Sequence, residues 1–211
     1  MLLAIDTSAG TSVAVVDREG GVLSELATTD TMRHAEVIGG MIQGALEQAS
    51  VAPQRLSGVA AGMGPGPFTG LRVGIAAAKA FALGIGKPVV PIVSHDAVAL
   101  ERYGAGHRGQ LLVVTDARRR ELYWSTYGGV DELGIPLRVG GPGLSKPDEL
   151  PEVAVHGAHV TRFDAASVSA GQLGLLAEQL YAAGRAFAED RPLYLRSPDV
   201  TPSSGPKRVT A

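Results

Sequence analysis

The sequence predicts an α/β protein in which a mixed sheet carries helices on its faces, and three observations predict this class. Short apolar runs separated by turn residues open the chain, which is typical of an antiparallel meander. Apolar runs then alternate with segments of helical periodicity, which is typical of strands joined by crossover helices. A second group of strands and a last helix follow a Gly-rich stretch, 104–109, where we place the boundary between two lobes.

The first lobe, residues 1–104, is predicted to begin with the order βββαβα, followed by one more strand and helix. Gly20-Gly21 is a hairpin signal between the second and third strands. Val37, Ile38, Met41 and Ile42 recur at helical spacing in the first helix. The expected strands are 2–6, 11–16, 22–28, 59–63 and 88–93, and the expected helices are 33–50, 69–83 and 94–103.

The second lobe, residues 105–196, is predicted to be smaller and to open with a hairpin around 117–120. The Gly/Pro-rich segment 128–150 is expected to be mostly loop. The polar segment 197–211 is expected to be a mobile tail, because it has little apolar content. The expected strands are 111–116, 121–127, 153–156 and 192–196, and the expected helix is 169–183.

Composition excludes several classes of protein. The 211 residues carry 19 Lys+Arg against 21 Asp+Glu, so a stand-alone nucleic-acid binder is disfavoured. Cysteine is absent, which removes disulfides and thiolate chemistry and suits a cytoplasmic location. The start of the chain lacks the basic segment of a signal peptide, and no apolar run looks long enough to span a membrane.

A Gly/Pro-rich loop, 64–70, lies between an apolar run and a long Ala-rich segment, which predicts strand, loop and helix. Thr69 is the expected N-cap of that helix. The free N–H groups at the helix start could cradle an anion, or the loop could be a rigid corner that presents the helix to a partner. The residues of the loop leave both interpretations open.

A second loop, between the first two strands, carries candidate nucleotide-binding residues. In nucleotide-handling sheets of the actin and sugar-kinase type, an Asp and small hydroxyl residues at this turn hold metal-phosphate. The same residue types also suit an ordinary β-turn, which is the simpler interpretation. The candidates are Asp6, Thr7, Ser8 and Thr11.

Histidine and arginine residues offer few further sites. His34 is expected at a helix start, exposed or capping, and a structural role is favoured for His95. A metal-binding helix would need a second His one turn after His95, where Ala99 stands, so no metal site is expected. Arg118, Arg119 and Arg120 are expected at a hairpin tip, either solvated or contacting an anion or a partner. No catalytic set can be assigned from spacing.

The predicted helix 69–83 is apolar nearly all round, with only Arg72 and Lys79 charged. One sheet and the helix 33–50 can each cover one side of it, and the glycines of helix 33–50 permit close approach. The third side of the helix is also apolar, so we expect a protein partner to cover it, unless a deeper core within the chain does so. The expected interface residues are His34, Val37, Ile38, Met41, Leu71, Arg72, Ile75, Ala78 and Lys79.

Four motifs together resemble the TsaB (YeaZ) family. They are the start 1–8 (MLLAIDTS), 33–36 (RHAE), 64–74 (GPGPFTGLRVG) and, more weakly, 192–196 (PLYLR). The similarity covers residues 1–200 and is dense only over 1–100. It implies a two-lobed fold of the actin/sugar-kinase/Hsp70 (ASKHA) type.

The resemblance also implies a function. Members of this family are partners of TsaD in making N6-threonylcarbamoyladenosine at position 37 of tRNAs that read codons beginning with A. TsaD carries the metal and performs the transfer, the ATPase TsaE joins the pair, and the family members form homodimers when alone. In TsaD a His-x-x-x-His pair holds the metal, and the matching positions here are His95 and Ala99.

The sequence therefore predicts an accessory subunit that is not an enzyme by itself and that meets tRNA only through the complex. No cofactor is expected to bind tightly to this chain alone, although ATP or ADP could bind at the boundary with TsaD. The alternatives are an ASKHA-type small-molecule kinase or ATPase and, less favoured, a metallopeptidase-like protein.

Overall fold

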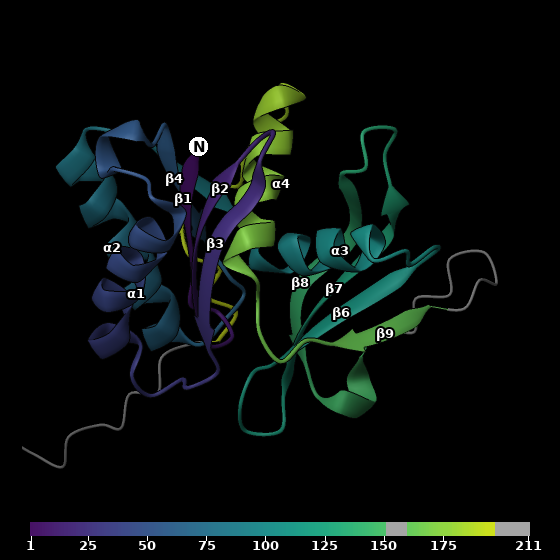
Figure 1. The fold of residues 1–211 in the computed structure, drawn as a ribbon. Helices are drawn as coiled ribbons and strands as arrows, with labels where there is room; N and C mark the ends of the chain where they lie inside the picture. The colour runs from purple at the N-terminus through teal and green to yellow at the C-terminus, as the bar shows by residue number, and fades with distance from the viewer. Residues whose placement is uncertain (151–159, 197–211) are drawn as a thin grey trace, which may run out of the picture.

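The computed structural model describes residues 1–150 and 160–196. It has two mixed sheets with flanking helices, so the α/β two-lobed fold class is confirmed (Figure 1). The predicted strand 153–156 and the predicted tail 197–211 lie outside the described residues.

The first sheet has the strand order β3-β2-β1-β4-β5. β1 pairs antiparallel with β2, with Leu3 opposite Val15, and parallel with β4, with Leu3 opposite Val59. All five predicted strands of this lobe are present. Their bounds are β1 Leu2–Asp6, β2 Thr11–Asp17, β3 Gly21–Thr28, β4 Gly58–Gly62 and β5 Val89–Ile92.

Alternating side chains of this sheet serve two separate cores, because successive residues of a strand point to opposite faces. Leu3, Ile5 and Val13 pack with helices α1 (His34–Ala49) and α2 (Phe68–Ile85) on one face. Ala4 and Val16 pack on the other face with α3 (Ser94–Gly104) and α4 (Ala170–Ala182). The buried runs read as continuous apolar segments because both faces are covered.

Helix α4 comes from the second half of the sequence but packs on the first sheet, between the two sheets in Figure 1. Gly174 allows the approach, since a Cβ there would lie 2.7 Å from Cγ2 of Val16 and 3.1 Å from Cβ of Ala4. The two lobes therefore share α4, and the division near 104–109 stays a prediction.

The second sheet has the order β8-β7-β6-β9. Its strands are β6 Leu111–Asp116, β7 Leu122–Val130, β8 Pro136–Ser145 and β9 Thr161–Asp164. The expectation of a loop over 128–150 is wrong, because β8 pairs with β7 despite its glycines. A Cβ at Gly143 would lie 2.3 Å from the Trp124 ring, so the small residue makes room for that indole. Strand β9 was not predicted from the sequence.

The expected last strand, 192–196, is wrong: this segment is irregular and joins neither sheet. It still lies against the first lobe, because Leu193 N–H donates to the Met63 carbonyl at 2.8 Å. Two short 3-10 turns, Pro53–Arg55 and Pro147–Glu149, complete the described elements.

Candidate functional site

The carboxyl end of β1 carries Asp6, which is buried and accepts hydrogen bonds from the chain at both carboxylate oxygens. Its Oδ1 accepts from Ser8 N–H at 2.8 Å and from Ser8 Oγ at 2.5 Å. Its Oδ2 accepts from Ser94 Oγ at 2.5 Å, and Ser94 Oγ accepts in turn from Gly64 N–H at 3.0 Å. Asp6 thus connects the first turn, the Gly/Pro loop and the start of α3. We call these groups the Asp6 corner.

The neighbouring hydroxyls of the same turn also bond within the chain. Thr7 Oγ1 donates to the Gly70 carbonyl at 2.7 Å, inside the first turn of α2. Thr11 Oγ1 lies 2.6 Å from Nδ1 of His34, at the start of α1. The structure therefore brings the candidates Asp6, Thr7, Ser8 and Thr11 together, and all four are buried. Their bonds are those of a structural corner, and a cofactor role for them stays a prediction.

Glycines let the Gly/Pro loop and its flanking elements, β4 and α2, press against this corner. A Cβ at Gly62 would lie 1.9 Å from Asp6 Oδ2, and one at Gly66 would lie 2.8 Å from Cα of Ser8. A Cβ at Gly74 would lie 2.1 Å from Thr7 Oγ1. The side of the loop that faces the turn is therefore filled by the protein itself, which favours the rigid-corner interpretation over an anion cradle on that side.

The sequence predicts Thr69 and Ser94 as helix N-caps, and both predictions are wrong. α2 begins at Phe68 with Pro67 as its N-cap, and Thr69 lies inside the first turn. α3 begins at Ser94 with Val93 as its N-cap. Ser94 bonds to Asp6 instead of to its own helix, because the buried carboxylate needs a donor.

The titration of the corner follows from its burial. Burial raises the pKa of Asp6, although hydrogen bonds from Ser8 and Ser94 and the nearby His34 oppose the rise. Burial lowers the pKa of His34, although the negative charges of Asp30 and Asp6 oppose this shift. The expectation that His34 is exposed is wrong, since only 7% of its surface is accessible.

His95 joins the two lobes and is fully buried. Its Nδ1 lies 2.9 Å from Ser125 Oγ of β7, and its Nε2 lies 2.9 Å from Thr115 Oγ1 of β6. Both ring nitrogens are therefore occupied by hydroxyls of the second sheet, while Ser94, one residue earlier, bonds to the first lobe. This arrangement agrees with the structural role favoured by the sequence.

We expect His95 to make the fold less stable as the pH falls. Burial and the Arg138 charge lower its pKa from 6.5 to about 3. Between those two values the unfolded chain binds a proton that the folded chain does not, so stability is lost as the pH falls, by up to about 1.4 kcal/mol per pH unit. From about pH 7 to about pH 5, urea unfolding should show about 2 kcal/mol more loss for the wild type than for His95→Gln. Equal losses would contradict this account.

The predicted interface residues divide by exposure. His34, Ile38, Leu71, Ile75 and Ala78 are buried in the core of this chain, so their assignment as contact residues is corrected. The sheet and α1 cover the α2 face on which Leu71, Ile75 and Ala78 lie. Val37 and Met41 are half-buried, and Arg72 and Lys79 are exposed.

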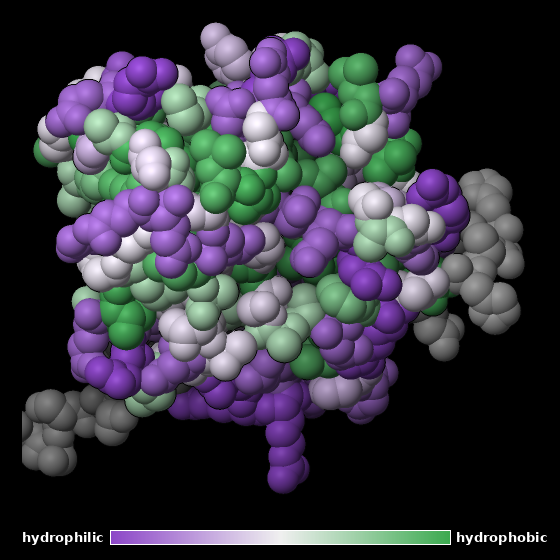
Figure 2. Space-filling model, viewed as in Figure 1, coloured by the Kyte–Doolittle hydropathy of each residue, from purple (hydrophilic) through white to green (hydrophobic). Residues whose placement is uncertain are grey.

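Among the described residues, none covers one side of α2. Leu83 is 84% exposed, and Ala76 and Ala80 are exposed beside it at helical spacing. On α1, no described residue lies within 4 Å of a Cβ built at Gly39 or Gly40, so packing in 1–150 and 160–196 does not explain these glycines. We call the exposed residues Arg72, Ala76, Lys79, Ala80 and Leu83 the α2 strip. On the face drawn in Figure 2, apolar side chains reach the surface in several places, separated by hydrophilic ones.

The segment 184–196, which we call the C-terminal strap, lies along part of the α2 strip. Arg72 Nε donates to Tyr194 Oη at 3.2 Å, and the Arg72 guanidinium lies 3.7 Å from the Phe68 ring centroid. Lys79 Nζ lies 2.8 Å from Asp190 Oδ1. Both charged residues of the strip therefore bind the chain's own strap. The sequence missed this contact, because residues more than 100 positions apart make it.

By length and composition alone, α2 is apolar enough to cross a membrane, which the sequence reasoning did not expect. Its buried residues pack with β1 and β4 in one core, as in a helix of a folded domain. Such a helix is weak evidence for a membrane span.

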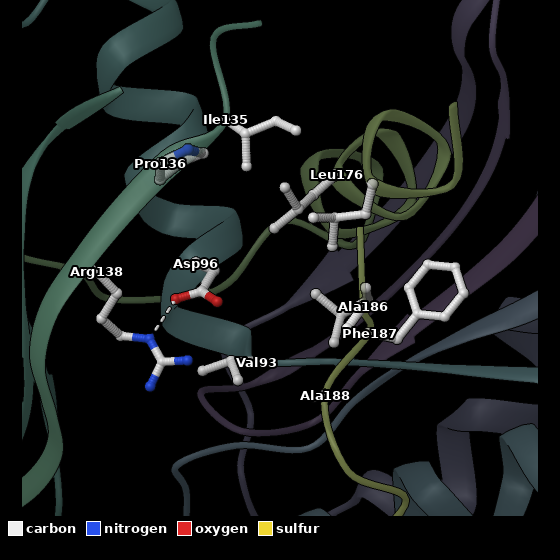
Figure 3. A pocket seen from close by; sticks show the side chains of 11 residues that line it. Val93, Asp96, Ile135, Pro136, Arg138, Leu176, Ala186, Phe187 and Ala188 are labelled. Carbon is white, nitrogen blue, oxygen red and sulfur yellow. Dashed lines mark ion pairs between the residues drawn. The ribbon is translucent and has the colours of Figure 1, made fainter. Parts of the chain in front are cut away.

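A small hollow of about 150 Å³ lies between the lobes (Figure 3). Asp96 and Arg138 meet on its wall, with Arg138 Nε 3.0 Å from Asp96 Oδ1, and Tyr127 Oη donates to the same oxygen at 2.7 Å. Burial raises the pKa of Asp96, and the Arg138 ion pair opposes the rise. Apolar residues of 92–93, of 135–136, of α4 and of 186–188 line the rest. The polar groups therefore neutralise one another across the lobe boundary.

Acidic and histidine side chains do not assemble into a metal centre in the described residues, where no group of three His, Cys, Asp or Glu is placed to hold an ion. Arg118, Arg119 and Arg120 form the predicted hairpin tip, each in the left-handed backbone region. Arg118 Nη2 donates to Thr31 Oγ1, so this residue contacts the loop before α1.

Comparison with known proteins identifies relatives of this chain. The family described as TsaD, tRNA N6-adenosine threonylcarbamoyltransferase, matches residues 5–180. An uncharacterised protein of Mycobacterium tuberculosis is 38% identical over 209 residues, which is 95% of this chain and 94% of that protein. YeaZ from Pseudomonas aeruginosa has a similar structure, with a TM-score of 0.78 and 26% identity over 92% of this chain and 99% of that one.

Relatives with a named role match a shorter stretch. The tRNA threonylcarbamoyladenosine biosynthesis protein TsaB of Bacillus subtilis is 32% identical over 126 residues, which is 60% of this chain and 54% of that protein. TsaB of Escherichia coli is 31% identical over 134 residues, which is 64% of this chain and 57% of that protein. The match thus spans little more than half of each of these two proteins.

Proposed function

This chain belongs to the TsaD family, as a TsaB/YeaZ-like member involved in threonylcarbamoyladenosine biosynthesis, and from that premise we propose that it is a non-catalytic subunit. In this proposal it binds TsaD and TsaE and supports transfer of the threonylcarbamoyl group to N6 of adenosine 37 in tRNAs that read codons beginning with A. It acts in the cytoplasm and meets tRNA only through the complex.

The observation that carries the proposal is the state of His95. The family resemblance places the first metal ligand of TsaD here, yet both ring nitrogens of His95 bond to buried hydroxyls of this chain. Ala99 stands one turn later, where a second ligand would be needed, and it is buried too. These contacts support a structural use of the position and argue against metal-dependent transfer by this chain alone.

The exposed side of α2 supplies the proposed contact with TsaD. Leu83, Ala76 and Ala80 are small or apolar and accessible, and Gly39 and Gly40 of α1 leave backbone open to close approach. Exposed apolar side chains on a helix gain stability when a partner covers them. The same surface serves a homodimer when TsaD is absent.

The kinase or ATPase alternative makes a different prediction about the isolated chain. An active-site Asp6 would need a free oxygen for metal-phosphate, whereas both of its oxygens accept hydrogen bonds from Ser8 and Ser94. We expect isothermal titration calorimetry of the purified chain with millimolar Mg-ATP to detect no binding that depends on Asp6. Saturable binding whose heat disappears in Asp6→Asn would favour the kinase alternative instead.

The partnership is tested by size-exclusion chromatography of the chain mixed with its cognate TsaD. We expect a complex that elutes ahead of either protein, and any ATP or ADP site at the boundary would appear as nucleotide binding by the complex but not by this chain. Separate elution at micromolar concentration would contradict the proposed role.

A further inference from the structure

A hollow of about 330 Å³ lies where the start of α2 meets the β6–β7 hairpin. This is the low end of the size range of small-molecule pockets. Its lining includes none of Asp6, Ser8 and Ser94, and no residue of the α2 strip. The residues that line it are Thr31, Met32, His34, Pro67, Thr69, Gly70 and Arg118.

His34 is the buried polar group of this hollow. The side chain is 7% exposed, and its Nδ1 is held by Thr11 Oγ1 at 2.6 Å. The other nitrogen, Nε2, lies beside Gly70, at 3.3 Å from a Cβ built there. Within the described ranges, 1–150 and 160–196, Nε2 has no hydrogen-bond partner. His34 and Gly70 both line the hollow.

In the tautomer of neutral His34 in which Nδ1 accepts from Thr11, Nε2 is a donor. Burial keeps the pKa of His34 below its ordinary value, so the ring is neutral near pH 7. A hydroxyl of Thr11 that donates to Nδ1 leaves the single ring proton on Nε2. That N–H then faces the hollow, where the described residues offer it no acceptor, so a bound oxyanion can supply one.

Two positive groups converge on the same space. α2 has 18 residues, its first N–H groups lack intrahelical acceptors, and Pro67 gives no side-chain cap. Arg118 Nη2 donates to Thr31 Oγ1, and its Nη1 lies 3.8 Å from Asp116 Oδ2. A guanidinium has five N–H donors, so these two contacts leave others for a ligand. The carboxylate of Asp116 offsets part of the positive charge of Arg118, so we expect the affinity for an anion to be weak.

We propose that this hollow binds the phosphate group of a small molecule through His34 Nε2, the guanidinium of Arg118 and the N-terminus of α2. Three donors from different elements suit a tetrahedral oxyanion, and the remaining volume admits a short attached group. The inference uses residues outside the proposed TsaD contact, so it stands or falls independently of the proposed function.

Inorganic phosphate is the probe, titrated into the full chain at constant ionic strength while the imidazole nitrogens are followed by NMR. We expect a saturable shift of His34 Nε2 with a Kd of a few millimolar, while His95, enclosed by Ser125 and Thr115, does not move. Arg118→Gln should weaken binding about tenfold or more. Arg120→Gln removes the same charge from the same hairpin outside the lining and should change the Kd less than about twofold.

Three results would overturn the proposal. They are no saturation by about 50 mM phosphate, an equal loss of affinity in Arg118→Gln and Arg120→Gln, and a shift of Nδ1 without Nε2. Acetate and sulfate titrations separate the classes of anion. Sulfate is expected to bind like phosphate, and acetate more weakly, whereas acetate binding as tightly would overturn the choice of phosphate.

Discussion

Replacing Gly74 by alanine should destabilise the fold by about 3 kcal/mol or more. The new Cβ would lie 2.1 Å from Thr7 Oγ1 and 3.0 Å from Thr7 Cγ2, both in the buried contact between α2 and the end of β1. To remove this overlap, α2 would have to move away from Thr7, and the hydrogen bond from Thr7 to the Gly70 carbonyl would be lost. Urea unfolding measures the change.

A second substitution and a control isolate the cause. In the double variant Gly74→Ala with Thr7→Ala, the atoms that clash most closely are gone, so we expect it to be more stable than Gly74→Ala alone. Gly84→Ala lies in the same helix with nothing within 4 Å of its new Cβ, and it should be neutral or stabilising by up to about 1 kcal/mol. Similar behaviour of Gly74→Ala and Gly84→Ala would contradict the packing described for the corner.

Replacing Leu83 by glutamate should weaken association with TsaD about 100-fold or more while changing the free energy of unfolding by less than about 0.5 kcal/mol. Leu83 is 84% exposed, so the charge costs little in the isolated chain, but a partner that covers it would bury an unpaired carboxylate. Affinity by surface plasmon resonance and stability by urea unfolding are measured on the same preparation.

The matched control is Leu133→Glu, the same change at a position that is 61% exposed on the β7–β8 hairpin of the second lobe. It should leave the affinity for TsaD unchanged. Ala78→Glu is unsuitable as an interface probe, because Ala78 is fully buried and the variant should unfold. Full binding by Leu83→Glu would place the interface elsewhere.

Much of the fold could be predicted because its signals are local. Helix α2 follows from an unbroken apolar and Ala-rich segment, and β1 and β2 follow from apolar runs between turn residues. β8 could not be predicted, because its glycines lower strand propensity. The reason for a glycine at position 143 is visible only in the structure, where the Trp124 ring lies against it. The place of α4 depends on its contacts with β1 and β2, which no local pattern records.

The candidate site was predicted as a set of residues but not as an arrangement. Asp6, Thr7, Ser8 and Thr11 do lie together, yet their partners stand far away in the sequence: Ser94 is 88 residues from Asp6. The apolar character of α2 correctly indicated burial on several sides, but the side that faces its own sheet could not be told from the side that faces outward. The strap contacts of Arg72 and Lys79 depend on the path of 184–196, which propensity does not specify.

Reconstitution tests the proposed role of this chain as an accessory subunit. The chain, its cognate TsaD and TsaE are combined with tRNA, ATP, and a source of the threonylcarbamoyl adenylate, and N6-threonylcarbamoyladenosine is quantified with each protein omitted in turn. We expect no product from this chain without TsaD, and at least about a tenfold drop when this chain is omitted or carries Leu83→Glu. Product formed by this chain without TsaD, or an undiminished yield in its absence, would contradict it.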